Sequence, residues 1–205
     1  MDLPAAAQRE NDSRHEGLKN VLSTLAILII APLIALFLTA FVFQSYEVDG
    51  PSMESTLQNH DRLIVLKLPR TIASLTGNAY LPKRGDVVIF NKAGLYDASG
   101  NQEKQLIKRV IGLPGDRVVV KDGIITVYNS EHPNGFQPDK TLPYGNVIGI
   151  TPGNIDMVVP DGQIFVSGDN RTNSYDSRSF GTIPASDIVG KLAVRVFPFN
   201  KVKDF

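Results

Sequence analysis

The hydrophobic residues of this chain are arranged in two different ways, one before and one after residue 44. Residues 21–43, VLSTLAILIIAPLIALFLTAFVF, form a 23-residue apolar run without a charged side chain. As a helix with a rise of about 1.5 Å per residue, the run reaches about 34 Å, enough to cross a hydrocarbon core of about 30 Å. Membrane helices tolerate a proline such as Pro32. The run therefore predicts a transmembrane helix.

A cleaved secretory signal is the alternative interpretation of this run. Such a signal has an apolar region of about 7–15 residues, followed by a small-x-small cleavage site. Here the run is longer and ends in Phe41-Val42-Phe43-Gln44, which is a poor cleavage site. We therefore expect an uncleaved anchor.

After the anchor, short segments rich in β-branched residues predict strands, because Gly, Pro, Asp or Asn bound each of them. The segments are 62–68, 86–90, 105–112, 116–120, 123–128, 162–168 and 188–197. The sequence VVVKDGIITV predicts a hairpin, since Asp-Gly between two such runs suits a type I′ turn. We therefore expect a mostly β, antiparallel sheet domain over residues 44–205.

The remaining segments lack a strand pattern. Residues 1–20 are polar and aperiodic, which predicts a tail ahead of the helix, and residues 69–85 and 91–104 predict loops. Residues 129–160 hold five prolines and four glycines, which predicts a small insertion or cap on the β domain.

The distribution of charged residues predicts the orientation of the helix in the membrane, whereas the overall charge does not indicate a polyanionic partner. The chain has 21 basic and 21 acidic residues and no recognisable nucleic-acid-binding motif, so we expect no nucleic-acid partner. Arg9, Arg14 and Lys19 precede the helix, whereas the next cation after it is Arg62. Positive flanks stay in the cytoplasm, so we expect residues 1–20 inside the cell and residues 44–205 outside the membrane.

The candidate chemistry begins with Ser52, in VDGPSMESTL close after the apolar run. A hydroxyl is a weak nucleophile until a base takes its proton. The chain has no cysteine and three histidines; His15 is expected across the membrane, and His60 and His132 lie in loop-like sequence without an obvious acidic partner. A Ser-His-Asp triad is therefore disfavoured.

Lys108, in LIKRVIGLPGD, is the other candidate base. Strand alternation places it on one face with Leu106 and Val110, while Arg109 lies on the opposite face. A lysine in such a strand can simply extend to water. If it points inward instead, burial disfavours the ammonium form, and the neutral amine can accept the serine proton.

A third segment, residues 164–181, runs from a strand into a turn crowded with charged and hydroxyl side chains, IFVSGDNRTNSYDSRSFG. Such composition usually indicates a solvated loop. It would equally provide hydroxyls and ion pairs around a buried lysine.

Together these segments resemble the signature boxes of bacterial type I signal peptidases, membrane-anchored Ser-Lys endopeptidases that remove signal peptides from exported proteins. GPSMESTL resembles the nucleophile box, KRVIGLPGD the lysine box and GDNRTNSYDSR the third box, and RGDVVIF (84–90) resembles the strand between them. The order and spacing fit over residues 44–198. The resemblance implies an antiparallel signal-peptidase/LexA-like β fold with an apolar membrane-facing surface. No motif in the sequence suggests a metal or an organic cofactor, so we expect none.

The resemblance also implies a role for individual residues. Ser52 would be the nucleophile, Lys108 the general base, and Ser174 the hydroxyl that orients the lysine amine. Gly50 is a departure, because some members carry a serine or threonine there that helps to hold the oxyanion.

Four further residues would support this dyad. By this resemblance, Asp176 and Arg178 match the family's structural ion pair beside the site, and Asp169 matches an acidic residue that supports the site. Met53 matches a residue that packs around the dyad and the substrate pocket. The strands at 62–68 and 86–90 are candidates for lining that pocket.

The expected function is thus a single-pass enzyme of the cell membrane that cleaves signal-peptide-bearing preproteins after small-x-small sites. Its partners would be these preproteins and the lipid bilayer, and we expect a monomer. One alternative is a non-catalytic, membrane-anchored β scaffold that binds exported proteins. A related Ser-Lys self-cleaving regulator is disfavoured by the anchor and by the absence of a DNA-binding segment.

Overall fold

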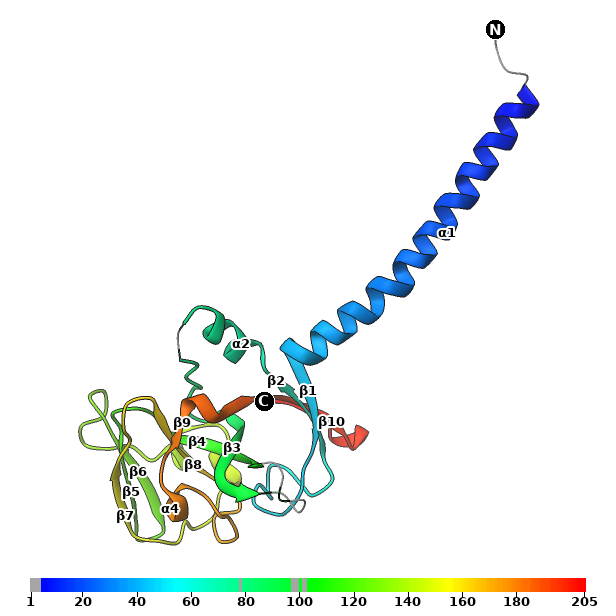
Figure 1. Ribbon diagram of the computed structural model, residues 1–205. Coiled ribbons are helices and arrows are strands. Elements are labelled where there is room, and N and C mark those ends of the chain that lie inside the picture. Colours follow the sequence, from blue (N-terminus) through cyan, green and yellow to red (C-terminus); the bar gives the residue numbers. More distant parts are fainter. Residues whose placement is uncertain (1–4, 78, 97–99, 101–102) are drawn as a thin grey trace. The chain divides into compact units, whose positions relative to one another are not determined.

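The structure, a computed structural model, describes residues 5–77, 79–96, 100 and 103–205 (Figure 1). The chain divides into two compact units, Met1–Val42 and Phe43–Phe205. The first unit is helical and the second consists of β-sheets with short helices.

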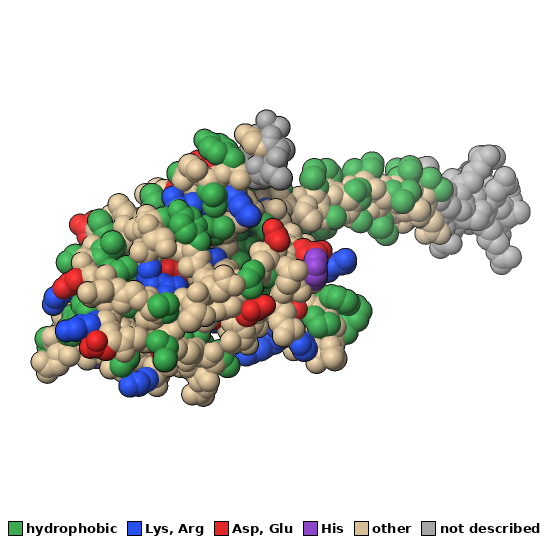
Figure 2. Space-filling model, turned by 90° about the horizontal axis from the view of Figure 1, so that it is seen from below, with side chains coloured by type: hydrophobic (Ala, Val, Ile, Leu, Met, Phe, Trp, Pro, Cys, Tyr) green, Lys and Arg blue, Asp and Glu red, His purple; other side chains and the backbone are tan. Residues whose placement is uncertain are grey.

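The first unit is helix α1 (Ala5–Phe37), which continues as the π-helix η1 (Leu38–Val42). Its segment Lys19–Val42 has a mean hydropathy of 2.9 and is not buried within the protein. Hydrophobic side chains accordingly cover this segment (Figure 2). Among the residues that the structure describes, there is therefore one N-terminal apolar helix, which is consistent with a single-pass membrane anchor. The helix begins at Ala5, where the sequence predicted an irregular tail, and Phe43 belongs to the first strand instead of the helix.

The second unit is built on an eight-stranded antiparallel sheet with the order β1-β2-β10-β3-β4-β8-β9, in which β11 pairs with β10. Its strands are β1 (Phe43–Glu47), β2 (Arg62–Leu66), β3 (Val87–Tyr96), β4 (Glu103–Gly112), β8 (Gln163–Ser167), β9 (Ile183–Pro184), β10 (Ile188–Phe197) and β11 (Lys203–Asp204). The mostly antiparallel β fold is thus confirmed.

A second, three-stranded sheet has the order β6-β5-β7, with β5 (Arg117–Lys121), β6 (Ile124–Tyr128) and β7 (Ile155–Val158). The predicted hairpin joins β5 to β6: Asp122 and Gly123 both have positive φ, as a type I′ turn requires. Ile111 of β4 and Phe165 of β8, from the eight-stranded sheet, pack with the valines of β5 and β6 in one core cluster that joins the two sheets.

Short helices fill the connections. They are α2 (Leu68–Leu75), α3 (Pro138–Thr141), α4 (Ser177–Phe180) and the 3₁₀ turns η2 (Gly145–Val147), η3 (Ala185–Asp187) and η4 (Phe199–Lys201).

Three expectations for the connections are wrong in part. Helix α2 occupies part of the predicted loop 69–85, and β3 and β4 extend into the predicted loop 91–104, of which residues 97–99 and 101–102 lie outside the described part of the chain. Segment 129–160 contains β7, which pairs with β5, although the sequence showed little strand pattern there. A short amphipathic helix and a four-residue strand give too little periodic signal to be found in the sequence.

Candidate active site

Ser52 lies in the turn that follows β1 and leads back to β2. The residues around it hold this turn against the sheet. Met53 and Leu57 are fully buried and pack with Val48 and Leu63 in one hydrophobic cluster. Apolar anchors on both sides of Ser52 therefore fix the backbone that carries its hydroxyl.

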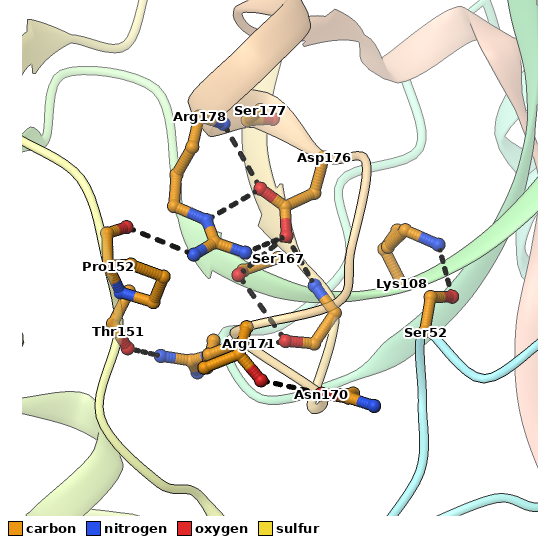
Figure 3. Close-up of polar contacts among 12 residues, drawn as sticks. Ser52, Lys108, Thr151, Pro152, Ser167, Asn170, Arg171, Asp176, Ser177 and Arg178 are labelled. Atoms are coloured by element: carbon orange, nitrogen blue, oxygen red, sulfur yellow. Dashed lines mark hydrogen bonds and ion pairs between the residues drawn. The ribbon is translucent and has the colours of Figure 1, made fainter.

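Lys108 points inward from β4. Its residue is only 3% exposed, and its Nζ lies 2.7 Å from Oγ of Ser52 (Figure 3). The amine also donates a hydrogen bond to the backbone carbonyl of Ile107 at 2.8 Å. The alternative of a lysine that extends to water is thus wrong for this strand. The structure brings together two side chains that are 56 positions apart in the sequence.

Burial lowers the pKa of the Lys108 ammonium to about 8, from an ordinary value of 10.5. The carboxylates of Asp176 and Asp169 oppose this shift, and the charge of Lys104 adds to it. With a pKa of about 8, about a tenth of the amine is neutral at pH 7, compared with about 0.03% for an ordinary lysine. Burial thus raises the population of a proton-accepting amine beside Ser52 about 300-fold.

Asp176 and Arg178 form a buried ion pair behind this site, with Nη2 of Arg178 2.7 Å from Oδ2 of Asp176 (Figure 3). Burial alone would raise the pKa of the Asp176 carboxyl, but the hydrogen bonds and charge of Arg178 outweigh it and lower the pKa. The same carboxylate accepts hydrogen bonds from the backbone N–H of Gly168 at 2.9 Å and the hydroxyl of Ser167 at 3.0 Å. Asp176 therefore fixes the end of β8 and the turn that follows it.

A second buried ion pair joins Asp169 to Arg109, the residue after Lys108. Arg109 binds Asp169 through Nε at 2.8 Å and Nη2 at 2.6 Å, and Thr56 donates its hydroxyl to the same carboxylate at 2.5 Å. Asp169 thus links the lysine strand to the serine turn, which is a more specific role than the general support predicted for it. Arg109 and Thr56 were missed in the sequence, although alternation had placed Arg109 on the face opposite Lys108.

The turn after β8 also contacts the backbone of Ser52 directly. The N–H of Asn170 donates to the Ser52 carbonyl at 3.0 Å, and the Asn170 side chain donates to the carbonyl of Pro51 at 3.2 Å. Gly168 lies equally close, since a Cβ on it would stand 2.2 Å from Oγ of Ser174 and 2.4 Å from the Ser52 carbonyl oxygen. Only glycine fits where these two segments meet.

We expect Gly168→Ala to lower the free energy of unfolding by about 1–3 kcal/mol, because the added methyl group would push Ser52 and Ser174 apart. Thermal unfolding of the full chain in detergent micelles measures this change. Gly149→Ala is the matched control, since a Cβ there meets no atom within 4 Å. Equal stability of the two variants would contradict the close packing at Gly168.

For two predicted site residues, Ser174 and Met53, the positions in the structure do not decide the predicted roles. The Ser174 hydroxyl is buried and helps to lower the pKa of the nearby Asp176 carboxyl, but it forms no hydrogen bond with Lys108 among the described residues. Its predicted bond to the Lys108 amine therefore stays a prediction. Met53 is fully buried in the core beneath the serine turn and does not line the cleft beside the dyad.

Segment 129–160 is fastened to the same turn by Arg171. Its guanidinium forms an ion pair with Asp139 of α3, and it donates hydrogen bonds to Thr151 at 2.8 Å and to the Gly168 carbonyl at 3.0 Å. Arg178 adds a hydrogen bond to the carbonyl of Pro152 at 3.1 Å. Two arginines of the third sequence box thus connect this segment to the turn behind the dyad.

His60 and His132 have partners other than the dyad. Contrary to expectation, His60 has an acidic partner, since its Nδ1 lies 2.8 Å from Oε1 of Glu47, but the side chains of both residues are largely exposed. His132 packs against the ring of Phe136. Neither histidine forms a hydrogen bond with Ser52 in the described part of the chain.

A cleft of about 170 Å³ opens beside Ser52 and Lys108. Its apolar wall consists of Val48, Leu63, Ile89, Leu106 and Ile107. Leu63 and Ile89 come from the two strands that the sequence named as pocket candidates. The small volume and apolar wall suit a small, uncharged side chain.

The backbone N–H of Ser52 is available as a hydrogen-bond donor. It has no acceptor among the described residues, whereas the N–H of Gly50 donates to the side chain of Asn59 at 2.8 Å. Gly50 has φ of +96°, a conformation that side-chain-bearing residues rarely adopt. Within the described residues, no group of three or more His, Cys, Asp or Glu side chains could hold a metal ion.

Comparison of sequence and structure found known proteins that are similar to this chain. The family model described as "Signal peptidase, peptidase S26" matches residues 21–197. Signal peptidase I of Bacillus caldolyticus is 36% identical over 183 residues, which cover 84% of this chain and 89% of the relative. Signal peptidase IB of Staphylococcus aureus (strain COL) is 31% identical over 196 residues, or 90% and 94% of the two chains. The crystal structure of a signal peptidase I from Enterococcus faecalis V583 is 26% identical, with a TM-score of 0.41, over 55% of this chain and 97% of that one.

Proposed function

Because this chain belongs to the signal peptidase I family of serine peptidases (peptidase S26), we propose that it cleaves signal-bearing preproteins with Ser52 as nucleophile and Lys108 as general base. The observation that carries the assignment of these two residues is the 2.7 Å distance between Nζ of the buried Lys108 and Oγ of Ser52. Family membership supports the reaction, and the geometry supports the roles.

In the first half of the reaction, the neutral Lys108 amine accepts the hydroxyl proton while Oγ of Ser52 attacks the carbonyl carbon of the peptide bond. The tetrahedral intermediate carries a negative oxygen, for which the unpaired N–H of Ser52 is a suitable donor. The Lys108 ammonium then gives its proton to the departing amine, and the C–N bond breaks. The signal peptide is left as an ester on Ser52.

In the second half, Lys108 again acts as base, now toward a water molecule that attacks the ester. The proton returns to Oγ of Ser52 as the acid product leaves. Arginine could not replace lysine in either step, because a guanidinium does not deprotonate in proteins. The ion pairs of Asp169 and Asp176 hold the strand and turns in place and do not themselves exchange protons in this scheme.

The substrate would lie extended along β4. Residues 105–107 pair with β3 on one side, whereas β8 pairs with β4 only from Arg109 onward. The free edge of residues 105–107 borders the cleft, so it can offer backbone hydrogen bonds to an extended peptide. A small residue before the cleaved bond would enter the cleft of about 170 Å³, which accounts for cleavage after small-x-small sites.

We place the reaction at the outer surface of the cell membrane. The apolar segment Lys19–Val42 would cross the bilayer once, with the N-terminus in the cytoplasm and residues 44–205 outside. Only eight residues separate Phe43 from Ser52. Even with the backbone fully extended, these two residues can therefore be at most about 30–32 Å apart. A signal peptide in the same membrane presents its cleavable bond at a similar level, which raises the effective concentration of the two partners.

The function is tested by mixing the full chain, purified in detergent, with a preprotein whose signal ends in Ala-x-Ala. We expect one cut after the second alanine, identified by N-terminal sequencing of the product, and no cut when that alanine is replaced by leucine. Absence of any product between about pH 6 and pH 10 would favour the non-catalytic scaffold instead.

The pH dependence follows from the lowered pKa of Lys108. The base must be neutral in the free enzyme, so kcat/KM for the preprotein should rise about tenfold per pH unit at low pH and level off above about pH 8. Initial rates at substrate concentrations well below KM, with the full chain in micelles, measure this profile. A rise that continues to about pH 10.5 would show an amine with an ordinary pKa.

A further inference from the structure

Arg195 is a buried arginine in the largely apolar strand β10. Its side chain is 10% exposed, and the residue lies between two irregularities in the pairing of β10 with β2. Such bulges change which side chains of a strand point inward. Leu192 and Arg195, although three positions apart, accordingly both contact the serine turn, which we define as residues 48–61. A buried guanidinium must be paired, so its partners show what Arg195 holds in place.

The Arg195 guanidinium holds the middle and the end of the serine turn. Its Nη1 donates a hydrogen bond to the carbonyl of Thr56 at 2.9 Å and lies 3.0 Å from Oδ2 of Asp61. Its Nε donates to the carbonyl of Lys201 at 2.8 Å. One side chain of β10 thus ties the serine turn to the segment that follows β10.

Thr56 connects this contact to the dyad. Its hydroxyl donates to the carboxylate of Asp169, which is paired with Arg109, the neighbour of Lys108. Its backbone N–H donates to the carbonyl three residues earlier at 3.1 Å, so Thr56 belongs to the same tight turn as Ser52. A shift of Thr56 would therefore move Ser52 relative to Lys108.

The serine turn depends on such contacts because part of it is strained. Ser55, the residue before Thr56, has φ of +82°, in the left-handed region that residues with a side chain rarely adopt. Strained conformations persist only where the surrounding structure holds them. The hydrogen bond from Arg195 to the carbonyl of Thr56 restrains the backbone directly after Ser55.

We propose that Arg195 is a positioning residue for the proposed reaction: through the carbonyl of Thr56 it holds the serine turn so that Oγ of Ser52 stays within hydrogen-bond distance of Lys108. The inference rests on the proposed function, because it assigns Arg195 to the same site. Arg195 itself touches neither the dyad nor the cleft among the described residues.

The test compares the wild type with Arg195→Lys, each as the full chain in micelles. Lysine keeps a positive charge opposite Asp61, but an ammonium group cannot reproduce the planar fork of the guanidinium toward its three partners. We expect kcat for the preprotein to fall about 10–100-fold, because a misplacement of about 1 Å costs on the order of 10²-fold. KM should change less than about twofold, since neither Arg195 nor Thr56 lines the cleft.

The pH profile separates this role from a simple loss of stability. A loosened serine turn would let water reach the Lys108 amine, so kcat/KM should level off at a higher pH than the value of about 8 expected for the wild type. The carboxylates of Asp169 and Asp176 and the charge of Lys104 also act on this amine, and they are the same in both proteins.

Arg84→Lys is the matched control. Arg84 is also largely buried, pairs with Asp116 at 2.8 Å and donates to the backbone carbonyl of Ile111, but none of its described hydrogen bonds reaches the serine turn. This substitution should lower Tm and leave both kcat and the pH at which kcat/KM levels off unchanged.

A double variant, Arg195→Met/Asp61→Asn, covers the case in which Arg195→Lys does not fold. It removes both buried charges together, so that neither is left unpaired, and we expect the same loss of kcat and the same shift of the pH profile. The inference is overturned if the folded Arg195 variants keep the wild-type kcat and pH profile and change only Tm, as Arg84→Lys does. Absence of cleavage by the wild type would overturn the proposed function and this inference with it, so the two failures are distinguishable.

Discussion

Replacement of Lys108 by methionine is expected to reduce kcat/KM for a preprotein on the order of 10⁴-fold or more, while it increases the stability of the fold. Methionine has a similar length and is apolar, so it fills the buried site 2.7 Å from Ser52 without providing a base. Lys108→Arg should be equally inactive, because the guanidinium stays charged. Normal turnover by either variant would contradict the neutral-amine mechanism.

The gain in stability follows from the direction of the pKa shift. Folding lowers the pKa of Lys108 from 10.5 to about 8, so between these pH values the unfolded chain binds a proton that the folded chain does not. Stability therefore rises with pH across this window, by about 3 kcal/mol in total, and below about pH 8 the buried ammonium costs that amount. Lys108→Met removes this cost at pH 7. Thermal unfolding in micelles should show a higher Tm for the variant at pH 7 and a smaller difference above about pH 10.5; a lower Tm at pH 7 would contradict it.

Replacement of Ser52 by alanine is expected to cause a loss of kcat/KM of similar size, on the order of 10⁴-fold or more, because no ester can form. The change removes one oxygen from a turn that Met53 and Leu57 anchor, so the fold should be retained. Ser45→Ala, on the exposed side of β1, is the matched control and should leave cleavage unchanged. Cleavage by Ser52→Ala at the wild-type rate would place the nucleophile elsewhere.

The two substitutions should also be non-additive. Nucleophile and base act as one unit, so the double variant Ser52→Ala/Lys108→Met should be no slower than either single variant. If the double variant instead lost kcat/KM by the product of the two single losses, each residue would act independently.

The parts of the structure that could be predicted from the sequence are those with a local signal. Seven segments with β-branched residues and turn residues at their ends became strands, and Asp122-Gly123 formed the expected turn. Strand β1 was missed because its polar sequence FQSYE directly follows the apolar run, and α2 was missed because it has only eight residues. In these cases the local pattern is too short or too polar to predict the element.

The candidate site, too, could be predicted from the sequence only where a local pattern indicates it. Alternation separated Lys108 from Arg109 but could not say which face of β4 was the buried one, since both faces carry apolar neighbours. The contacts of Asp169 with Arg109, and of Asn170 with the Ser52 carbonyl, join residues 60 and 118 positions apart, and no local pattern encodes them. The resemblance to a family supplied the roles, and the structure supplied the distances.

The central claim is that the Lys108 amine loses its proton near neutral pH, and NMR titration of this amine tests it most directly. Full-length chain labelled with ¹³C and ¹⁵N in its lysines, in micelles and with Ser52→Ala to prevent cleavage of the sample, would be titrated while the Lys108 side-chain signals are followed. Lys108→Met identifies those signals by their disappearance. We predict a midpoint near pH 8, separate from the other lysines. A midpoint near 10.5 would contradict the account, since Ser52 would then have no base at physiological pH.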